Sequence, residues 1–185
     1  MTKIFFLTFI TFIGLANLSG QNTQYHNIDS LYHIIDSLKK NDANIELIHK
    51  YVNLILKSDS CNADLFWYKG WLYDKMGDYE AAKYFYFRAI AVDSLHFNAL
   101  YNLGALYYNE GIREGDTAFY EMTSKRFLEK FFIASNKFSL SQIFFSRAFS
   151  LNPDDPELIG ILNEIRKRLF RTPKHIEKLI NNQQE

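Results

Sequence analysis

Residues 63–94 read ADLFWYKGWLYDKMGDYEAAKYFYFRAIAVDS, and this stretch decides the fold because its first half recurs farther along the chain. The residues that recur 34 positions later are Trp67 as Tyr101, Gly70 as Gly104, Leu72 as Leu106, Tyr73 as Tyr107 and Gly77 as Gly111. A fixed period of this length is typical of proteins built from stacked helical hairpins. The sequence therefore predicts an all-α fold made of repeated hairpins.

The same stretch resembles a tetratricopeptide repeat (TPR). The residues that carry the resemblance are Phe66, Gly70, Tyr73, the turn 77–79, Ala82, Tyr86 and Ala89. The stretch departs from the family pattern at Lys69, where leucine is usual, and at Ser94, where a closing proline is usual. Small residues let two helices cross closely while aromatic side chains fill the space between them. The resemblance, which extends to exported TPR proteins of Gram-negative bacteria, implies a short TPR-type solenoid.

The second repeat is longer than the first. After Gly111 the match resumes with an offset of 59 residues, so that Phe85 and Ala89 correspond to Phe144 and Ala148. One repeat therefore contains a 25-residue insertion, and residues 112–140 keep helix-like apolar spacing without proline. We expect both helices of this hairpin to be lengthened. Turn-forming residues place the connection within 115–124, at Gly115-Asp116-Thr117 or, more weakly, at Thr123-Ser124.

Hydrophobic periodicity and helix signals define the rest of the domain. We expect a TPR-like α-solenoid over residues 27–172, with hairpins at 27–57, 63–94 and 97–152. Asp155-Pro156 is a helix start, which predicts a C-terminal capping helix over 155–171 and leaves a tail at 173–185.

The N-terminus has the pattern of a secretory signal peptide. Lys3 precedes the apolar stretch IFFLTFITFIGLANL, which is shorter than the ~20 residues that span a bilayer. We expect cleavage after Gly20, followed by a polar leader at 21–26; retention of the segment is the alternative. The protein is then exported to the periplasm or beyond the cell, and association with the outer membrane is left open.

Charge and motifs narrow the function classes. Without Lys3 the chain has 20 basic and 21 acidic side chains, which disfavours binding to nucleic acid. The five histidines are scattered, no phosphate loop or nucleophile motif is present, and Asp154-Asp155 reads as a helix cap. We therefore predict no catalytic residue, no metal site and no cofactor. The lone Cys61 forms no internal disulfide.

One basic cluster near the C-terminus has two interpretations. It comprises Arg166, Lys167, Arg168, Arg171, Lys174 and Lys178. It is either the solvated face of the capping helix, whose C-terminus favours cations, or a docking patch for an acidic partner.

The resemblance implies a binding groove lined by the first helix of each hairpin. The matching positions are Asp64, Trp67, Trp71, Asp74, Lys75, Asn98, Tyr101, Ala105, Tyr108 and Asn109. Family members that grip a C-terminal carboxylate carry lysine and asparagine at the positions of Trp67 and Trp71, so an aromatic groove is expected instead. The alternative for either tryptophan is packing against the preceding hairpin.

These features predict a non-enzymatic protein-interaction module or scaffold of the cell envelope that binds a protein or peptide partner. Two other functions stay open. One is a structural subunit, homo-oligomeric or within an envelope complex, that uses the extended hairpin 111–145. The other is a helical protein that binds an apolar ligand.

Overall fold

The computed structural model describes residues 45–58, 61–119 and 124–170, and all elements in these ranges are α-helices. They are α3 (Ile45–Ser58), α4 (Ala63–Lys75), α5 (Tyr79–Val92), α6 (Phe97–Phe119), α7 (Ser124–Leu151) and α8 (Pro156–Phe170). The chain divides into two compact units, 1–51 and 52–185, and the hairpins described below belong to the second. The expected signal peptide, the leader, the first helix of hairpin 27–57 and the tail lie outside the described residues.

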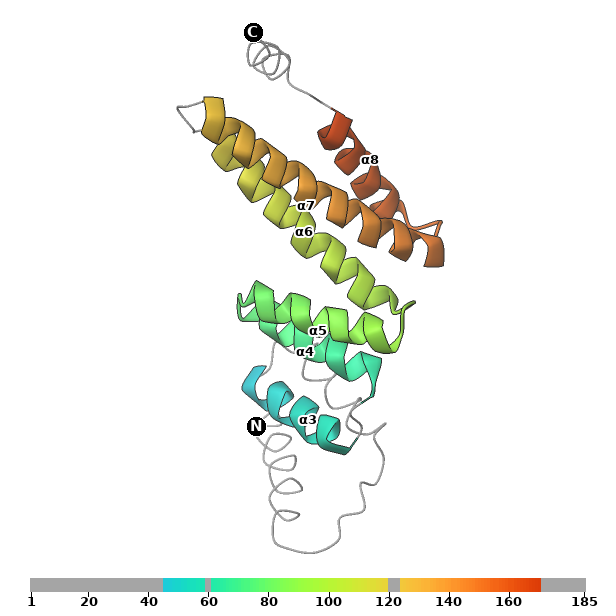
Figure 1. Ribbon diagram of the computed structural model, residues 1–185. Helices are drawn as coiled ribbons and strands as arrows, with labels where there is room; N and C mark the ends of the chain where they lie inside the picture. The colour runs from blue at the N-terminus through green and yellow to red at the C-terminus, as the bar shows by residue number, and fades with distance from the viewer. Residues whose placement is uncertain (1–44, 59–60, 120–123, 171–185) are drawn as a thin grey trace, which may run out of the picture. The chain divides into compact units, whose positions relative to one another are not determined.

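The first complete hairpin joins α4 to α5 (Figure 1). Asn62 is the N-cap of α4, because its side chain accepts a hydrogen bond from the Leu65 amide. Asp78 is the N-cap of α5 and accepts from the Ala81 amide in the same way. Between them Gly77 adopts a φ of 80°, and its amide donates to the Asp74 carbonyl at 3.0 Å. Glycine adopts this left-handed conformation without strain, so α4 ends in a Schellman-type turn.

Close helix crossings occur at the repeated glycines. A Cβ on Gly70 would lie 2.5 Å from Cδ1 of Tyr86, and one on Gly104 would lie 2.9 Å from the ring of Phe145. Gly70 and Gly104 are 34 residues apart, whereas Tyr86 and Phe145 are 59 apart. The packing thus follows the two offsets that the sequence predicted.

A stacked aromatic pair repeats in the same register. Tyr73 stacks on Phe85 with centroids 5.3 Å apart and an interplanar angle of 6°. Tyr107 stacks on Phe144 at 5.7 Å, also at 6°. Lys69, which departs from the family pattern, places its ammonium 4.6 Å from the Phe85 centroid and so covers this ring.

The lengthened hairpin is formed by α6, with 23 residues, and α7, with 28, against 13 and 14 residues in α4 and α5. Helix α6 ends at Phe119 and α7 begins at Ser124, so the connection lies within the predicted interval 115–124. Its preferred position at Gly115-Asp116-Thr117 is wrong, because these three residues lie within α6. The helix continues through Gly115, where a Cβ would make an ordinary van der Waals contact, at 3.9 Å, with Ala134 of α7. Gly111, the counterpart of the turn residue Gly77, is likewise helical and packs against Phe138.

Helix α8 packs against α7 (Figure 1). The Asp155 carboxylate accepts hydrogen bonds from the amides of Glu157 and Leu158, at 2.9 and 3.2 Å, so the predicted cap and helix start are confirmed. Leu158 and Ile165 are fully buried on the inner face of α8. The predicted fold class, an all-α TPR-type solenoid with a lengthened hairpin and a final helix, is confirmed.

No helix within residues 45–58, 61–119 or 124–170 is both long and apolar enough to span a lipid bilayer. The same ranges hold no group of three or more side chains able to ligate a metal ion.

Candidate functional site

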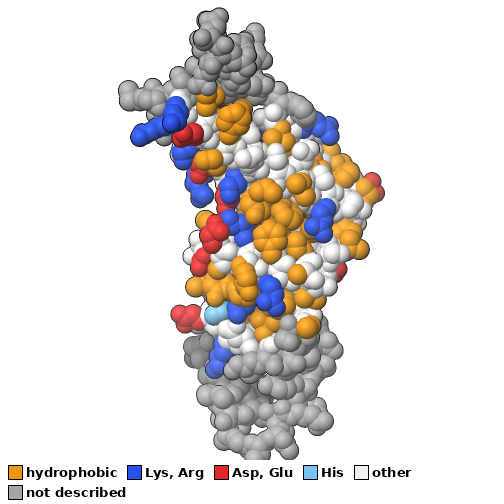
Figure 2. All heavy atoms as spheres, in the orientation of Figure 1, with side chains coloured by type: hydrophobic (Ala, Val, Ile, Leu, Met, Phe, Trp, Pro, Cys, Tyr) orange, Lys and Arg blue, Asp and Glu red, His pale blue; other side chains and the backbone are white. Residues whose placement is uncertain are grey.

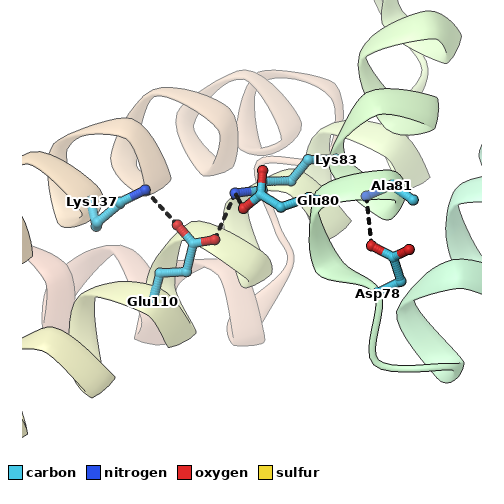
Figure 3. Close-up of polar contacts among 6 residues, drawn as sticks. All are labelled: Asp78, Glu80, Ala81, Lys83, Glu110 and Lys137. Atoms are coloured by element: carbon cyan, nitrogen blue, oxygen red, sulfur yellow. Dashed lines mark hydrogen bonds and ion pairs between the residues drawn. The ribbon is translucent and has the colours of Figure 1, made fainter.

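A buried charge cluster fixes the mutual placement of α5, α6 and α7. Figure 3 shows Lys83 of α5 and Lys137 of α7 directed at the carboxylate of Glu110 on α6. Their ammonium nitrogens lie 2.7 Å from Glu110 Oε1 and Oε2, respectively, and Lys83 also pairs with Glu80 at 2.6 Å. Both ammoniums lie over the Tyr107 ring, 5.3 and 5.4 Å from its centroid.

Protonation of this cluster is set by a balance of burial and pairing. Burial opposes ionisation of Glu110, but the hydrogen bonds from Lys137 and Lys83 outweigh it and lower the pKa of Glu110. Burial likewise opposes the charge on Lys83. The hydrogen bonds from Lys83 to Glu110 and Glu80 outweigh this effect of burial and raise the pKa of Lys83. The charged forms are therefore the stable ones, and this lysine is held as an ammonium rather than as a free nucleophile.

His96 joins the start of α6 to α4. Its Nδ1 accepts a hydrogen bond from the Ala99 amide at 3.1 Å, so its Nε2 carries the proton and donates to Asp64 Oδ1 at 3.0 Å. His96 is buried and acts as the N-terminal cap of α6, a role that its residue type does not signal in the sequence. Asp64, predicted to line the groove, thus has a structural partner although it stays exposed.

Trp67 does not lie open in a groove as expected. It is 9% exposed, and its ring packs against those of Tyr68 and His96 with centroids 4.6 and 6.0 Å apart. Trp67 is therefore packed, but these rings belong to its own helix and to the start of the next repeat, so packing against the preceding hairpin stays a prediction. The imidazole of His96, at the start of the next repeat, contributes one of these contacts.

Asp74, another predicted groove residue, is half-buried. It is hydrogen bonded to the Tyr86 hydroxyl, which also accepts from Asn102 at 2.8 Å. Burial raises the pKa of Asp74, and the nearby Lys75 and the Tyr86 hydroxyl only partly offset it. Burial also raises the pKa of Tyr86.

The other predicted groove residues keep accessible surface. Lys75, Asn98 and Asn109 are exposed, and Trp71, Tyr101, Ala105 and Tyr108 are half-buried. The Lys75 ammonium lies 5.8 Å from the Trp71 ring centroid, and Asn109 borders a hollow of 120 Å³ beside Tyr79 and Arg113. The first helices α4 and α6 thus present half-buried aromatic rings next to exposed polar groups.

Tyr101 reaches across to α8. Its hydroxyl donates to Glu157 Oε1 at 2.6 Å, and its ring meets Phe145 edge-on at 5.4 Å. Burial and the Glu157 carboxylate raise the pKa of Tyr101 to about 12. Tyr108 meets Phe138 edge-on at 5.7 Å in the same way. One ring face of each tyrosine is committed to packing, and the hydroxyl of Tyr101 is committed to α8.

A second accessible feature bears on the open alternative of a helical protein that binds an apolar ligand, although none of its residues was predicted as a site. Residues of α6, α7 and α8 enclose a cleft of about 310 Å³ whose walls include Phe127, Phe131 and Phe138. Its only signal in the sequence is the run of phenylalanines at helical spacing in the insertion, which could equally fill a core. Apolar side chains are also exposed along α7, and Figure 2 shows hydrophobic side chains gathered over the middle of the face in view.

No family model matches the chain, and no curated protein is similar to it in sequence. Similarity is found to solved structures. A crystal structure of a Bacteroides ovatus ATCC 8483 protein aligns with a TM-score of 0.72 at 15% identity, covering 86% of this chain and 82% of that one.

Two further structures contain bound peptides. The first TPR of Spaghetti (RPAP3), bound to the HSP90 peptide SRMEEVD, aligns with a TM-score of 0.55 at 15% identity, over 76% of this chain and 90% of that one. The Yersinia enterocolitica type III secretion chaperone SycD, in complex with a peptide of the translocator YopD, aligns with a TM-score of 0.51 at 14% identity. The alignment covers 89% of this chain and 100% of that one. At such identity the likeness establishes the fold alone, and the fold is of the TPR type.

Proposed function

We propose that this protein is a non-enzymatic protein-interaction module of the bacterial cell envelope. In this proposal it binds a peptide or protein segment on the face formed by α4 and α6, the first helices of the two hairpins. The observation that carries the proposal is the accessible surface of these helices. Trp71 and Tyr108 are half-buried, the exposed Lys75 lies over the Trp71 ring, and Asn98 and Asn109 are also exposed.

The chemistry of this face favours a particular partner. Aromatic rings anchored on one side by core packing contribute binding energy at a low cost in conformational entropy. The exposed asparagines can hydrogen bond to the main chain of a ligand. The partner is an extended or helical segment with apolar or proline side chains, and two solved structures of the same fold hold peptides.

The envelope location rests on residues 1–20, whose basic start and apolar stretch have the pattern of an export signal. If this segment is cleaved, intact mass spectrometry of the exported protein will find Gln21 at or within a few residues of the mature N-terminus. Recovery of the full-length chain from the membrane fraction would contradict cleavage.

Site-specific photo-crosslinking tests the binding face. A photo-crosslinking amino acid replaces Tyr108 on α6 in one variant, and the exposed Tyr84 on α5 in a matched control. We expect an envelope protein to be crosslinked at position 108 and not at position 84. Crosslinking at 84 alone would move the binding site to the second helices and refute the proposal.

A structural subunit is the second candidate function, and one observation favours it. Phe132, Ile133, Leu140 and Ile143 of α7, all in the extended hairpin, are 56, 42, 37 and 53% exposed. Such side chains are frequent in permanent interfaces. Size-exclusion chromatography with light scattering distinguishes the candidates, because a constitutive oligomer dissociated by Ile143→Glu supports the subunit and a monomer supports the module.

A further inference from the structure

The cleft of about 310 Å³ lies where α8 does not cover the whole of α7. Helix α7 has 28 residues and α8 has 15, and the two are connected by a short turn at 152–155. At 1.5 Å per residue, α8 extends back along roughly half of α7. The first half of α7 and the last turns of α6 are therefore left beside the C-terminal end of α8.

The walls that α6 and α7 contribute to the cleft are mostly apolar. Phe127 and Phe131 stack with centroids 6.4 Å apart, and Phe138 closes the cleft toward α8. The small residues Gly115 and Ala134 create the space, because a Cβ on Gly115 would approach Ala134 Cβ only to 3.9 Å. Larger side chains at these two positions would fill the cleft without a clash between backbones.

The rim of the cleft carries an excess of positive charge. The α8 residues at the rim are the cationic Lys167 and Arg168 and the anionic Glu164. Arg168 pairs with Glu164 at 3.0 Å and lies over the Phe138 ring, 5.5 Å from its centroid. Among the described residues no ion pair involves Lys167, which is exposed at the mouth of the cleft. One positive charge is thus available to an anionic group that lies across the rim.

We propose that this cleft is a second binding site, for a partner peptide segment in which large apolar side chains are followed by acidic ones. The apolar side chains enter between the phenylalanines, and the acidic side chains lie along the rim, where Lys167 offers them the available positive charge. This complementarity assigns a role to part of the basic cluster that the sequence analysis singled out.

A peptide fits the cleft better than a small molecule does. Pockets that retain small molecules bury roughly 70–90% of the ligand surface and begin at about 300 Å³. Here the volume is at that lower bound, and Lys167 and Arg168 at its mouth are exposed. A ligand that continues beyond the cleft uses this open side, because its flanking residues lie along the rim.

The cleft residues are distinct from the accessible α4 and α6 residues of the proposed binding face, so this inference does not depend on the proposed function. The probe is a fluorescein-labelled peptide, GSLLFEEEG, and its control is GSLLFKKKG. Fluorescence anisotropy with the full mature chain should show binding of the acidic peptide and at least tenfold weaker binding of the basic one.

Two substitutions locate the site, and each has a matched control. Gly115→Leu fills the cleft, whereas Gly160→Leu makes the same change on α8, where a Cβ meets nothing within 4 Å. Lys167→Glu reverses the rim charge, whereas Arg166→Glu reverses the neighbouring exposed charge outside the cleft. We expect affinity for the acidic peptide to fall about tenfold in the first member of each pair and to change less than twofold in the second.

The outcomes that overturn the proposal are specific. They are absence of binding by the acidic peptide, equal binding of both peptides, or an affinity unaffected by Lys167→Glu, an exposed substitution that leaves the fold intact. Decanoate that competes with the peptide and binds more tightly than it does would make the cleft a small-molecule site instead. Trp71→Ala should leave peptide binding unchanged, and this separates failure of the cleft from failure of the α4 and α6 face.

Discussion

Glu110→Gln is the substitution that most directly tests how the helices are held together. Glu110 is 7% exposed, and its carboxylate is bonded to two lysines at 2.7 Å. Glutamine keeps the size and shape of the side chain and removes only the charge. The ammonium of Lys83, whose side chain is 9% exposed, then loses its buried counterion.

The burial and pairing of these side chains set the expected loss of unfolding free energy. Removal of one partner of a buried ion pair costs about 3–5 kcal/mol, because the remaining charge is left in a poorly solvated place. Lys83 retains Glu80, and the Lys137 side chain is 30% exposed and can be hydrated, so we expect the low end, about 3 kcal/mol. For a chain of this size the melting temperature should fall by about 6–12 °C.

Thermal unfolding followed by circular dichroism measures the effect, and Glu114→Gln is the control. Glu114 lies one turn later on α6 and pairs with Lys130 at 2.8 Å, with side-chain exposures of 21 and 35%. Replacement of Glu114 by glutamine should lower the free energy of unfolding by about 0–1 kcal/mol. The double variant Lys83→Met with Glu110→Met should regain most of the stability, because apolar pairs replace buried ion pairs well. Equal losses for Glu110→Gln and Glu114→Gln would refute the reasoning.

Three further predictions concern stability. Gly70→Ala should destabilise by about 1–3 kcal/mol, since its Cβ would meet Tyr86 at 2.5 Å, whereas Gly115→Ala should stabilise by about 0.5–1 kcal/mol in urea melts. His96→Ala should cost about 0.5–2 kcal/mol through loss of the α6 cap, and His96→Asn should restore part of it in the same melts. The pKa of Glu110 lies below its ordinary 4.5, so its stabilisation is complete above that pH and is lost as the pH falls through the lowered value. The melting temperature should therefore fall more steeply below pH 4.5 in the natural protein than in the double variant Lys83→Met with Glu110→Met. Asp74, whose pKa is raised, is present in both proteins, so its contribution cancels in the comparison.

The repeated core could be predicted because it depends on residues that recur. The 34- and 59-residue offsets pair Gly70 with Gly104 and Phe85 with Phe144, and the structure places both pairs in equivalent contacts. The helix start at Asp155 was likewise readable, because a carboxylate before a helix has a local function.

The details that were missed depend on contacts between residues distant in sequence. Gly115 has turn chemistry, but its neighbour in space is Ala134, and the helix continues through it. Trp67 occupies a groove position of the repeat, yet it is buried and its ring packs against those of Tyr68 and His96. The partners of Glu110 lie 27 residues before and after it, so no local pattern indicated the charge cluster. Nor could aromatic spacing alone distinguish the phenylalanines of a cleft from those of a filled core.

The central claim, that α4 and α6 form the binding face, is tested by one capture measurement. Trp71→Ala with Tyr108→Ala removes two half-buried rings from this face, and Tyr84→Ala with Phe87→Ala removes two exposed rings from α5. Each variant is used to capture the partner crosslinked at position 108, with the melting temperature recorded for every protein. We predict at least a tenfold loss of capture for the first variant and none for the second, because aromatic anchors supply most of the binding energy. Full capture by a folded Trp71→Ala, Tyr108→Ala variant would contradict the claim.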